Sequence, residues 1–210
     1  MLDDALIARA AHLSSATLHE AAGKRGALPA SLKPLASHQR VCGRALPVLS
    51  PPGDNLWLHR GIAAAEPGDV LIVDVGDGLE YGYWGEIMAQ GAQARGVAGL
   101  VITGGVRDSL RMVAMDFPVF SAAVCIQGTG KDPHGAGQVG APLTLGRTEI
   151  RRGDLVFGDA DGVVVLPQAE AEAIIMASER RDADEAIILE RLRAGETTID
   201  IYDLPREQAR

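Results

Sequence analysis

The stretch Trp84–Asp108, WGEIMAQGAQARGVAGLVITGGVRD, decides the fold and locates the candidate site. It opens on the Gly-acid step Gly85-Glu86, continues through an Ala/Gly-rich segment typical of a helix, and reaches the apolar run at residues 99–102. The run predicts a buried strand, followed by a turn that begins at Gly104. Arg107-Asp108 is therefore expected just past the carboxyl end of a strand, where ligands of α/β folds collect.

The Arg107-Asp108 step carries two kinds of chemistry. The Arg107 guanidinium can bind a small carboxylate through two N–H groups. Asp108 offers a hard oxygen ligand to Mg²⁺ or Mn²⁺. In the alternative interpretation the two side chains only pair with each other or cap a helix, and their spacing favours neither.

The length predicts one domain over residues 1–210, or a single domain with appendages. Its 210 residues can bury a substantial core, and 47% hydrophobic with 23% charged residues excludes wholesale disorder. A net charge of -8 argues against a nucleic-acid partner. The chain has no apolar run of the ~20 residues that cross a bilayer, and acids stand where a signal peptide carries basic residues. We therefore expect no membrane association and a cytoplasmic protein, with Cys42 and Cys125 as buried core thiols.

Hydrophobic periodicity and turn residues outline the elements. Helices are predicted at residues 2–22, 55–65 and 168–194, and strands at residues 41–48, 70–75, 155–157 and 163–166. The first helix is expected to break near Ser14-Ser15, with Ser15 as the cap of its second half and Gly23 as its stop. Asp159–Gly162 predicts a hairpin turn. The charged helix at 168–194 either is solvated or lies across a neighbouring subunit.

Longer stretches carry a family resemblance. They are SATLHEA, RVCGRALPV, PPGDNLWLHRGIAAAEPGDVLIVD, YWGEIMAQGAQARGVAGLVITGGVRD, GTGKDPHGAGQVGAPLTLG, RRGDLVFGDADGVVVLP and LRAGETTIDIY. In this order and spacing they resemble the RraA-like family, which holds the 4-hydroxy-4-methyl-2-oxoglutarate / 4-carboxy-4-hydroxy-2-oxoadipate aldolases and the regulators of ribonuclease E. The resemblance implies a β/β/α swivelling domain with αββα layers, assembled as a homotrimer or homohexamer with sites at subunit boundaries. Periodicity alone does not distinguish this fold from a doubly wound sheet.

The family's aldolases share an acid, twenty intervening residues and then Arg-Asp, and this chain is similar there. Glu86 occupies the acid position and Arg107-Asp108 match in type. The acid is typically Asp in the family's aldolases, so Glu86 is one methylene longer. The regulators usually lack the acid after the arginine, so Asp108 favours an enzyme over the alternative, a non-catalytic protein-binding regulator of the ribonuclease E type.

The resemblance implies a metal-dependent class II pyruvate aldolase that acts on a 4-hydroxy-2-keto acid, with oxaloacetate decarboxylation as a possible side activity. Asp108 would hold Mg²⁺ or Mn²⁺, and Arg107 would neutralise the pyruvyl carboxylate. Backbone N–H groups of Gly85, Glu86, Ile87 and Met88 at a helix start would help to bind that carboxylate. Glu86 would orient or deprotonate a water that acts as base. Asp108→Ala is expected to leave the fold intact.

Several other residues are weaker candidates for the site. The three lysines, Lys24, Lys33 and Lys131, stand in polar or Gly/Pro-rich loops, which disfavours a Schiff-base mechanism. His134 lies in a Gly-rich loop and is interpreted as a histidine without a chemical role. Glu179 and Glu185 on the last helix are interpreted as solvated, although an acid from a neighbouring chain contributes to the site in similar aldolases.

Overall fold

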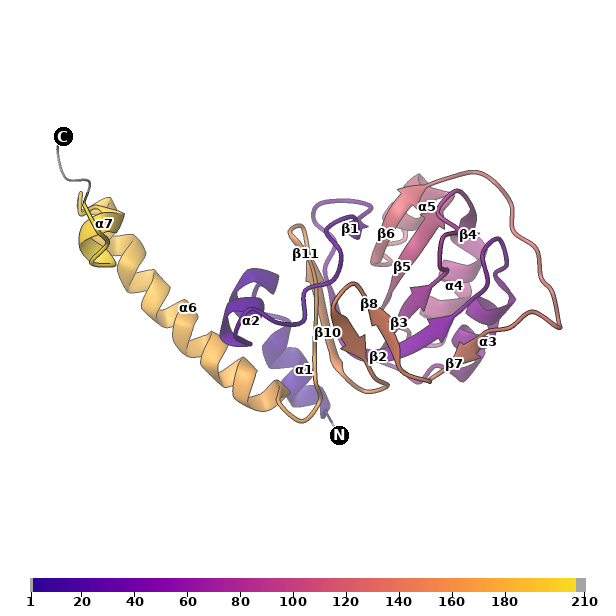
Figure 1. Cartoon of the computed structure of the whole chain (residues 1–210), viewed down its shortest axis with the longest axis horizontal. Coiled ribbons are helices and arrows are strands. Elements are labelled where there is room, and N and C mark those ends of the chain that lie inside the picture. The colour runs from indigo at the N-terminus through magenta and orange to yellow at the C-terminus, as the bar shows by residue number, and fades with distance from the viewer. Residues whose placement is uncertain (1, 207–210) are drawn as a thin grey trace.

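Parallel strands form the centre of the sheet in this computed structural model, which describes residues 2–206. They are β2 (Val41–Leu49), β3 (Asp69–Asp74), β5 (Gly99–Val106) and β6 (Val119–Val124). The strand order is β1-β6-β5-β3-β2-β10-β11 (Figure 1). Strand β3 is buried along nearly its whole length, as its apolar sequence predicts.

One layer of helices connects these parallel strands. It consists of α3 (Leu56–Ala64), α4 (Glu86–Ala94) and α5 (Ser109–Ala114). All three pack into one apolar cluster through side chains such as Leu58, Met88 and Met112, together with Leu71 and Ile102 of the sheet. The connecting helices therefore share one face of the sheet, unlike those of a doubly wound fold, which cover both faces.

The other face of the sheet curves around a second core, because the sheet is nearly closed. Strand β10 (Leu155–Asp159) pairs antiparallel with β2 and with β11 (Gly162–Leu166) at one edge. At the other edge β1 (Lys33–Pro34) pairs with β6. The segment at residues 26–34 joins the two edges, since the Leu28 N–H donates to the Val163 carbonyl at 2.9 Å. The layered α/β architecture predicted from the sequence is confirmed.

A second layer of helices packs against β10 and β11. It consists of α1 (Asp4–Ala10), α2 (Ser15–Ala21) and the first part of α6 (Ala171–Arg193). The break between α1 and α2 is confirmed, but the predicted cap residue was wrong. Ser14 is the N-cap and accepts from the Thr17 N–H at 3.0 Å. Ser15 instead donates its N–H and its hydroxyl to Asp159, which is the turn residue that the sequence predicts.

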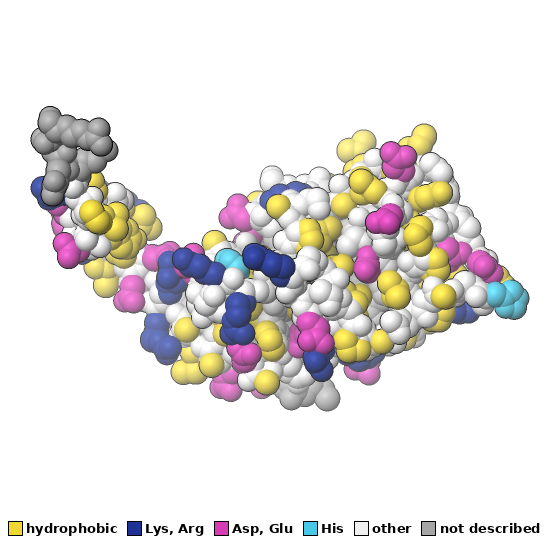
Figure 2. Space-filling view, viewed as in Figure 1, with side chains coloured by type: hydrophobic (Ala, Val, Ile, Leu, Met, Phe, Trp, Pro, Cys, Tyr) yellow, Lys and Arg dark blue, Asp and Glu magenta, His cyan; other side chains and the backbone are white. Residues whose placement is uncertain are grey.

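Helix α6 leaves the body of the protein after two turns. Its buried residues all lie at its start: Ala171, Ile174, Ile175 and Ser178. The remainder, with α7 (Thr198–Ile201), forms an arm that projects away from the sheet (Figure 1). Hydrophobic side chains, including Ile187, Leu189 and Tyr202, are exposed along this arm (Figure 2). No helix within residues 2–206 is long and apolar enough to span a membrane.

Other boundaries differ from the sequence prediction. Strand β5 continues through Gly104 to Val106 instead of turning at Gly104. Patterns in the sequence also do not predict the short strands β4 (Gly82–Trp84), β7 (Gln138–Val139), β8 (Leu143–Leu145) and β9 (Thr148–Ile150), nor β6. Cys42 and Cys125 are both free. Cys42 packs against the core beneath the second helix layer, and burial raises the pKa of its thiol, as expected of a core thiol. Cys125 is only partly buried just after β6, so the prediction of a core thiol was wrong there.

Gly105 permits the contact that extends β5. A Cβ atom at this position would lie 2.7 Å from the Tyr81 carbonyl oxygen and 3.0 Å from the Cys125 Cβ. The first neighbour is backbone and cannot rotate away. A side chain at position 105 would therefore push β4 off β5.

We predict that Gly105→Ala lowers the free energy of unfolding by about 1–3 kcal/mol, because the added methyl group overpacks this contact. Gly91→Ala in α4 is the matched control, since nothing lies within 4 Å of a Cβ there. In a helix this change should stabilise by about 0.5–1 kcal/mol. Urea titration of both variants measures the difference, and equal midpoints would contradict the prediction.

Candidate active site

The candidate site lies where two strand ends meet. Strand β4 runs parallel to the last part of β5, with Gly82 opposite Gly105 and Trp84 opposite Val106. The Arg107 N–H donates to the Trp84 carbonyl at 2.8 Å and holds the two ends together. The β4–α4 and β5–α5 turns therefore stand side by side at the carboxyl edge of the sheet, although twenty residues separate Glu86 from Arg107 in the sequence.

Gly85 lets the side chains of the second turn lie against the backbone of the first. A Cβ atom at Gly85 would lie 2.4 Å from Asp108 Oδ2 and 3.2 Å from Arg107 Cγ. Any larger residue would displace both side chains. The Glu86 N–H donates to Asp108 Oδ2 at 3.2 Å. Asp108 thus caps α4 from a distance, because the N-cap residue Gly85 has no side chain to do so.

Asp108 also has an unusual backbone conformation. Its φ of 55° and ψ of 32° place it in the left-handed region, which Asp and Asn tolerate better than most residues. This conformation starts α5 at Ser109 and turns the Asp108 carboxylate back toward α4. Asp116 has the same φ, so this conformation alone does not identify a functional residue.

Glu86 is held by a residue that the sequence analysis missed. Arg111 Nη1 donates to Glu86 Oε2 at 2.7 Å. This hydrogen bond, together with the negative charges of Glu86 and Asp108, raises the pKa of Arg111 above its usual value. An arginine three residues after Asp108 on a short helix was the available signal. Gly85 therefore lies beside the Asp108 carboxylate and the Arg107 side chain, and the Glu86–Arg111 pair follows directly at the start of α4.

The first turn of α4 offers less to a ligand than the sequence predicts. The Glu86 N–H is already bonded to Asp108, which leaves the N–H groups of Ile87 and Met88 without an acceptor inside the helix. The Met88 side chain is buried, and its sulfur accepts from Asn55 Nδ2 at 3.5 Å. Met88 can therefore contact a ligand only through its backbone.

The remaining candidates lie in other contacts. His134 is exposed and its N–H donates to Asp132 Oδ1 within the loop. Glu179 pairs with Arg9 of the same chain through two hydrogen bonds of 2.9 and 2.7 Å. Glu185 pairs with Arg181 one turn away along the arm. Within residues 2–206 no three His, Cys, Asp or Glu side chains form a cluster that could hold a metal.

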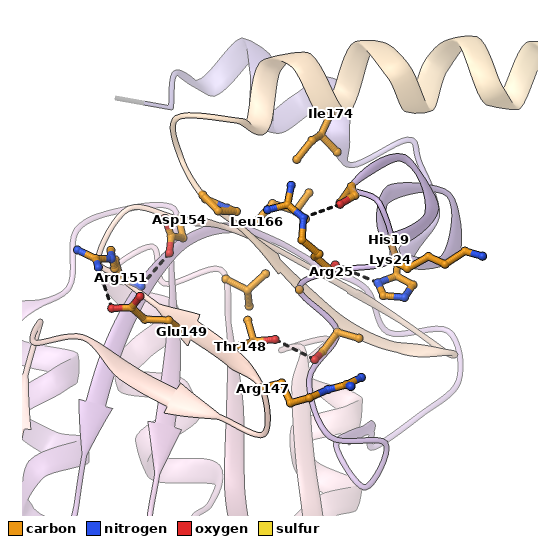
Figure 3. Close-up of a pocket in the computed structure, with 15 residues that line it drawn as sticks. His19, Lys24, Arg25, Arg147, Thr148, Glu149, Arg151, Asp154, Leu166 and Ile174 are labelled. Carbon is orange, nitrogen blue, oxygen red and sulfur yellow. Dashed lines mark hydrogen bonds and ion pairs between the residues drawn. The ribbon is translucent and has the colours of Figure 1, made fainter.

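A cavity of about 680 Å³ lies elsewhere, between α2, the β8–β9 hairpin and the start of α6 (Figure 3). Apolar residues such as Leu166 and Ile174 line it together with several basic side chains. Arg151 pairs with Glu149 on the same wall, and Arg25 pairs with Glu170. Its lining residues do not include Glu86, Arg107 or Asp108, so this cavity is separate from the candidate active site.

Comparison with known proteins identifies the family. The family model described as Aldolase/RraA matches residues 4–165. A protein of Halalkalibacterium halodurans named "Putative 4-hydroxy-4-methyl-2-oxoglutarate aldolase" is 34% identical over 158 residues, which cover 75% of this chain and 74% of that protein. A Thermus thermophilus protein of the same name is 30% identical over 142 residues, covering 68% and 85% of the two chains.

Solved structures agree with the sequence comparison. An uncharacterized protein from Pseudomonas syringae pv. tomato superposes with a TM-score of 0.82 at 27% identity, covering 93% of this chain and 92% of that chain. The RNA-processing inhibitor RraA from Thermus thermophilus superposes with a TM-score of 0.66 at 27% identity, covering 73% and 92%. The chain belongs to the RraA-like family, as its sequence indicates.

We predict that Asp108 contributes to stability as well as to the site, which modifies the sequence-based expectation. Asp108→Ala should lower the free energy of unfolding by about 1–3 kcal/mol, because it removes the cap of α4 and puts alanine in a left-handed conformation. Asp108→Asn keeps both the acceptor oxygen and the conformation, and should cost less than about 0.5 kcal/mol.

Asp116 provides the matched control, since it has the same φ of 55° and is exposed at the end of α5. Its side chain accepts no hydrogen bond in the described chain, so Asp116→Ala reports the backbone cost alone. Chemical denaturation of the three variants separates the two contributions. Equal losses for Asp108→Ala and Asp116→Ala would show that the cap contributes nothing.

Proposed function

We propose that this protein is a divalent-metal-dependent pyruvate aldolase that cleaves a 4-hydroxy-2-keto acid to pyruvate and a second keto acid. The contact of the Arg107 and Asp108 side chains with Gly85, directly before Glu86, carries the proposal. It supplies an anion-binding guanidinium, a carboxylate with a free edge and a second carboxylate at one strand edge. The aldolase names of its relatives support the same reaction class.

Arg107 is the proposed ligand of the keto acid's own carboxylate. Its side chain is exposed and lies across Gly82 and Gly85, at the two ends of β4 and directly before α4. Two N–H groups of the guanidinium can take both carboxylate oxygens. The N–H groups of Ile87 and Met88 and the positive end of the helix dipole favour an anion at the same place. The carboxylate is thereby fixed and the reacting carbon atoms are oriented.

Glu86 is the proposed base. Cleavage begins when the proton of the C4 hydroxyl is removed, and the C3–C4 electron pair then passes into pyruvate as its enolate. Glu86 is only partly exposed, and its contact with Arg111 holds the carboxylate at the site mouth. A base in this position can reach the hydroxyl directly or through one water.

The residues present fit a lightly held divalent ion. Asp108 accepts one hydrogen bond through Oδ2, and its Oδ1 accepts none within residues 2–206. A single carboxylate suits Mg²⁺ or Mn²⁺, which in proteins often keep waters and substrate oxygens as their other ligands. When bound, the ion would supply Lewis-acid stabilisation of the charge that develops on the keto oxygen.

The fold alone does not choose between catalysis and regulation. A structural neighbour is described as an RNA-processing inhibitor, so the same architecture carries a second candidate function. The carboxylate of Asp108 beside the Arg107 side chain favours catalysis, because it puts a hard-oxygen metal ligand next to an anion-binding group.

The proposal includes assembly as a homotrimer or homohexamer. Exposed apolar side chains surround the site, namely Ile87, Leu110, Val124 and Ile126, and others follow the α6–α7 arm. A small-molecule site normally excludes more water than this open surface does. A second copy of the chain that covers the rim with its arm would close the site and bury both apolar surfaces.

We predict that the purified protein releases pyruvate from 4-hydroxy-4-methyl-2-oxoglutarate and from oxaloacetate only when Mg²⁺ or Mn²⁺ is present, and that a chelator stops release. Because the metal itself decarboxylates oxaloacetate slowly, protein-free reactions with metal are subtracted. Asp108→Asn should lower kcat/KM more than roughly 100-fold, since Lewis-acid stabilisation is worth several kcal/mol. Asp116→Asn makes the same change outside the site and should retain full activity.

Pyruvate release that is unaffected by the chelator or by Asp108→Asn would contradict the metal site. No release from either substrate, together with a folded protein by circular dichroism, would favour the regulatory function instead. The assay therefore separates the two candidate functions before any partner is known.

We predict that Glu86→Gln lowers kcat on the order of 100-fold, because the amide keeps the shape and the contact with Arg111 but cannot accept a proton. Inhibition by the product pyruvate should change little, since Arg107 is intact. Glu86→Asp should retain partial activity. Glu149→Gln, at another exposed glutamate paired with an arginine at 2.8 Å, is the control. An unchanged kcat in Glu86→Gln would make Glu86 structural.

A further inference from the structure

Arg111 is the charged residue of the site that the proposed reaction does not use. Its guanidinium bonds to Glu86 through Nη1, and the side chain is otherwise 70% exposed at the mouth of the site. A guanidinium has five N–H donors, so most of its donors face the solvent. Arg111 is therefore placed to receive an anion without releasing Glu86.

The charges around Gly85 require a second cation for some substrates. Arg107 neutralises the carboxylate next to the keto group. A further carboxylate on C4 would then lie close to Glu86 and Asp108, which carry the same sign of charge, and like charges in contact disfavour binding. Arg111 is the group of this cluster that can offset that repulsion, because it bonds to one of these acids and interacts electrostatically with the other.

The position of Arg111 relative to the proposed base also favours Arg111 as the group that meets a carboxylate on C4. Glu86 as base must come within about 3 Å of the C4 hydroxyl or of a water bonded to it. Arg111 bonds to that same Glu86 carboxylate at 2.7 Å. A group attached to C4 alongside the hydroxyl can therefore reach the exposed edge of the guanidinium. A carboxylate there can accept two parallel N–H bonds.

We infer that Arg111 determines substrate specificity at this site by binding the carboxylate on C4 of the keto acid while it holds Glu86. The inference rests on the proposed aldolase function. It restricts the preferred substrates to those that carry a second carboxylate on the carbon that bears the hydroxyl. A substrate with a methyl group in that place would leave the guanidinium without its ligand.

The test compares two substrates that differ only in this group, 4-hydroxy-4-methyl-2-oxoglutarate and 4-hydroxy-4-methyl-2-oxopentanoate. Arg111→Gln should lower kcat/KM for the dicarboxylate by roughly 10–100-fold, mainly through KM, because a charge-assisted hydrogen bond is lost. For the methyl analogue the change should be less than about threefold, since no such bond forms there. Arg111→Lys should fall between, because lysine keeps the charge without the fork.

Arg151→Gln is the matched control, because Arg151 forms an exposed ion pair of similar length, 2.8 Å, with Glu149 away from the site. A second measurement does not depend on turnover: inhibition by 2-oxoglutarate and by 2-oxopentanoate, which lack the C4 hydroxyl. Arg111→Gln should weaken inhibition by 2-oxoglutarate roughly 10-fold or more and leave that by 2-oxopentanoate unchanged.

Each result has a separate meaning. If Arg111→Gln lowers kcat/KM equally for both substrates and weakens inhibition equally for both inhibitors, Arg111 only positions Glu86 and the inference is overturned. If neither changes, the Glu86–Arg111 contact is an ordinary surface ion pair, which contributes little, and the inference is again overturned. If the wild-type protein cleaves neither substrate, the proposed function itself fails.

Discussion

The close backbone contact between β4 and the end of β5 is the constraint on which the site depends. Strand β3 pairs with the first half of β5 and ends at Asp74, after which β4 pairs with the second half. This exchange of partners works only because Gly105 leaves room for the Tyr81 carbonyl. It places two βα turns next to each other at one edge of the sheet, so that residues from both can act on one ligand.

The electrostatics of this edge are balanced within the chain. Glu86 and Asp108 lie at the first turn of α4, where the helix dipole favours negative charge. Glu86 also pairs with Arg111, and Asp108 accepts the Glu86 N–H. Of the two guanidinium groups, that of Arg111 is already oriented by its hydrogen bond to Glu86. Preorganisation of this kind lowers the cost of ordering the site when it binds its ligand.

Much of this arrangement follows from the sequence, and the reason is local. Arg107 and Asp108 could be placed at a strand end because an apolar run directly precedes them, and the helix from Glu86 has a strong composition signal. Strand β4 could not be predicted, because its three residues are too few to show a periodicity and its pairing depends on a tertiary contact with β5. Arg111 could not be predicted as a site residue, because in the sequence it resembles any exposed helical residue. Only the position of the Glu86 side chain shows that the two are paired. The closure of the sheet depends on residues 26–34, which pair with strands far away in the sequence, so local patterns do not predict it.

The left-handed backbone at Asp108 has a consequence for the history of the family. Asp, Asn and Gly adopt this conformation at lower cost than most residues. The turn itself therefore favours these three amino acids at position 108, before any chemistry is selected. A homologue that abandoned the carboxylate but kept the turn would retain Asn or Gly there. One that carries a bulky or β-branched residue would have had to rebuild the start of α5. The amino acid at position 108 of a homologue thus indicates whether the loss of the carboxylate came before or after the loss of the left-handed turn.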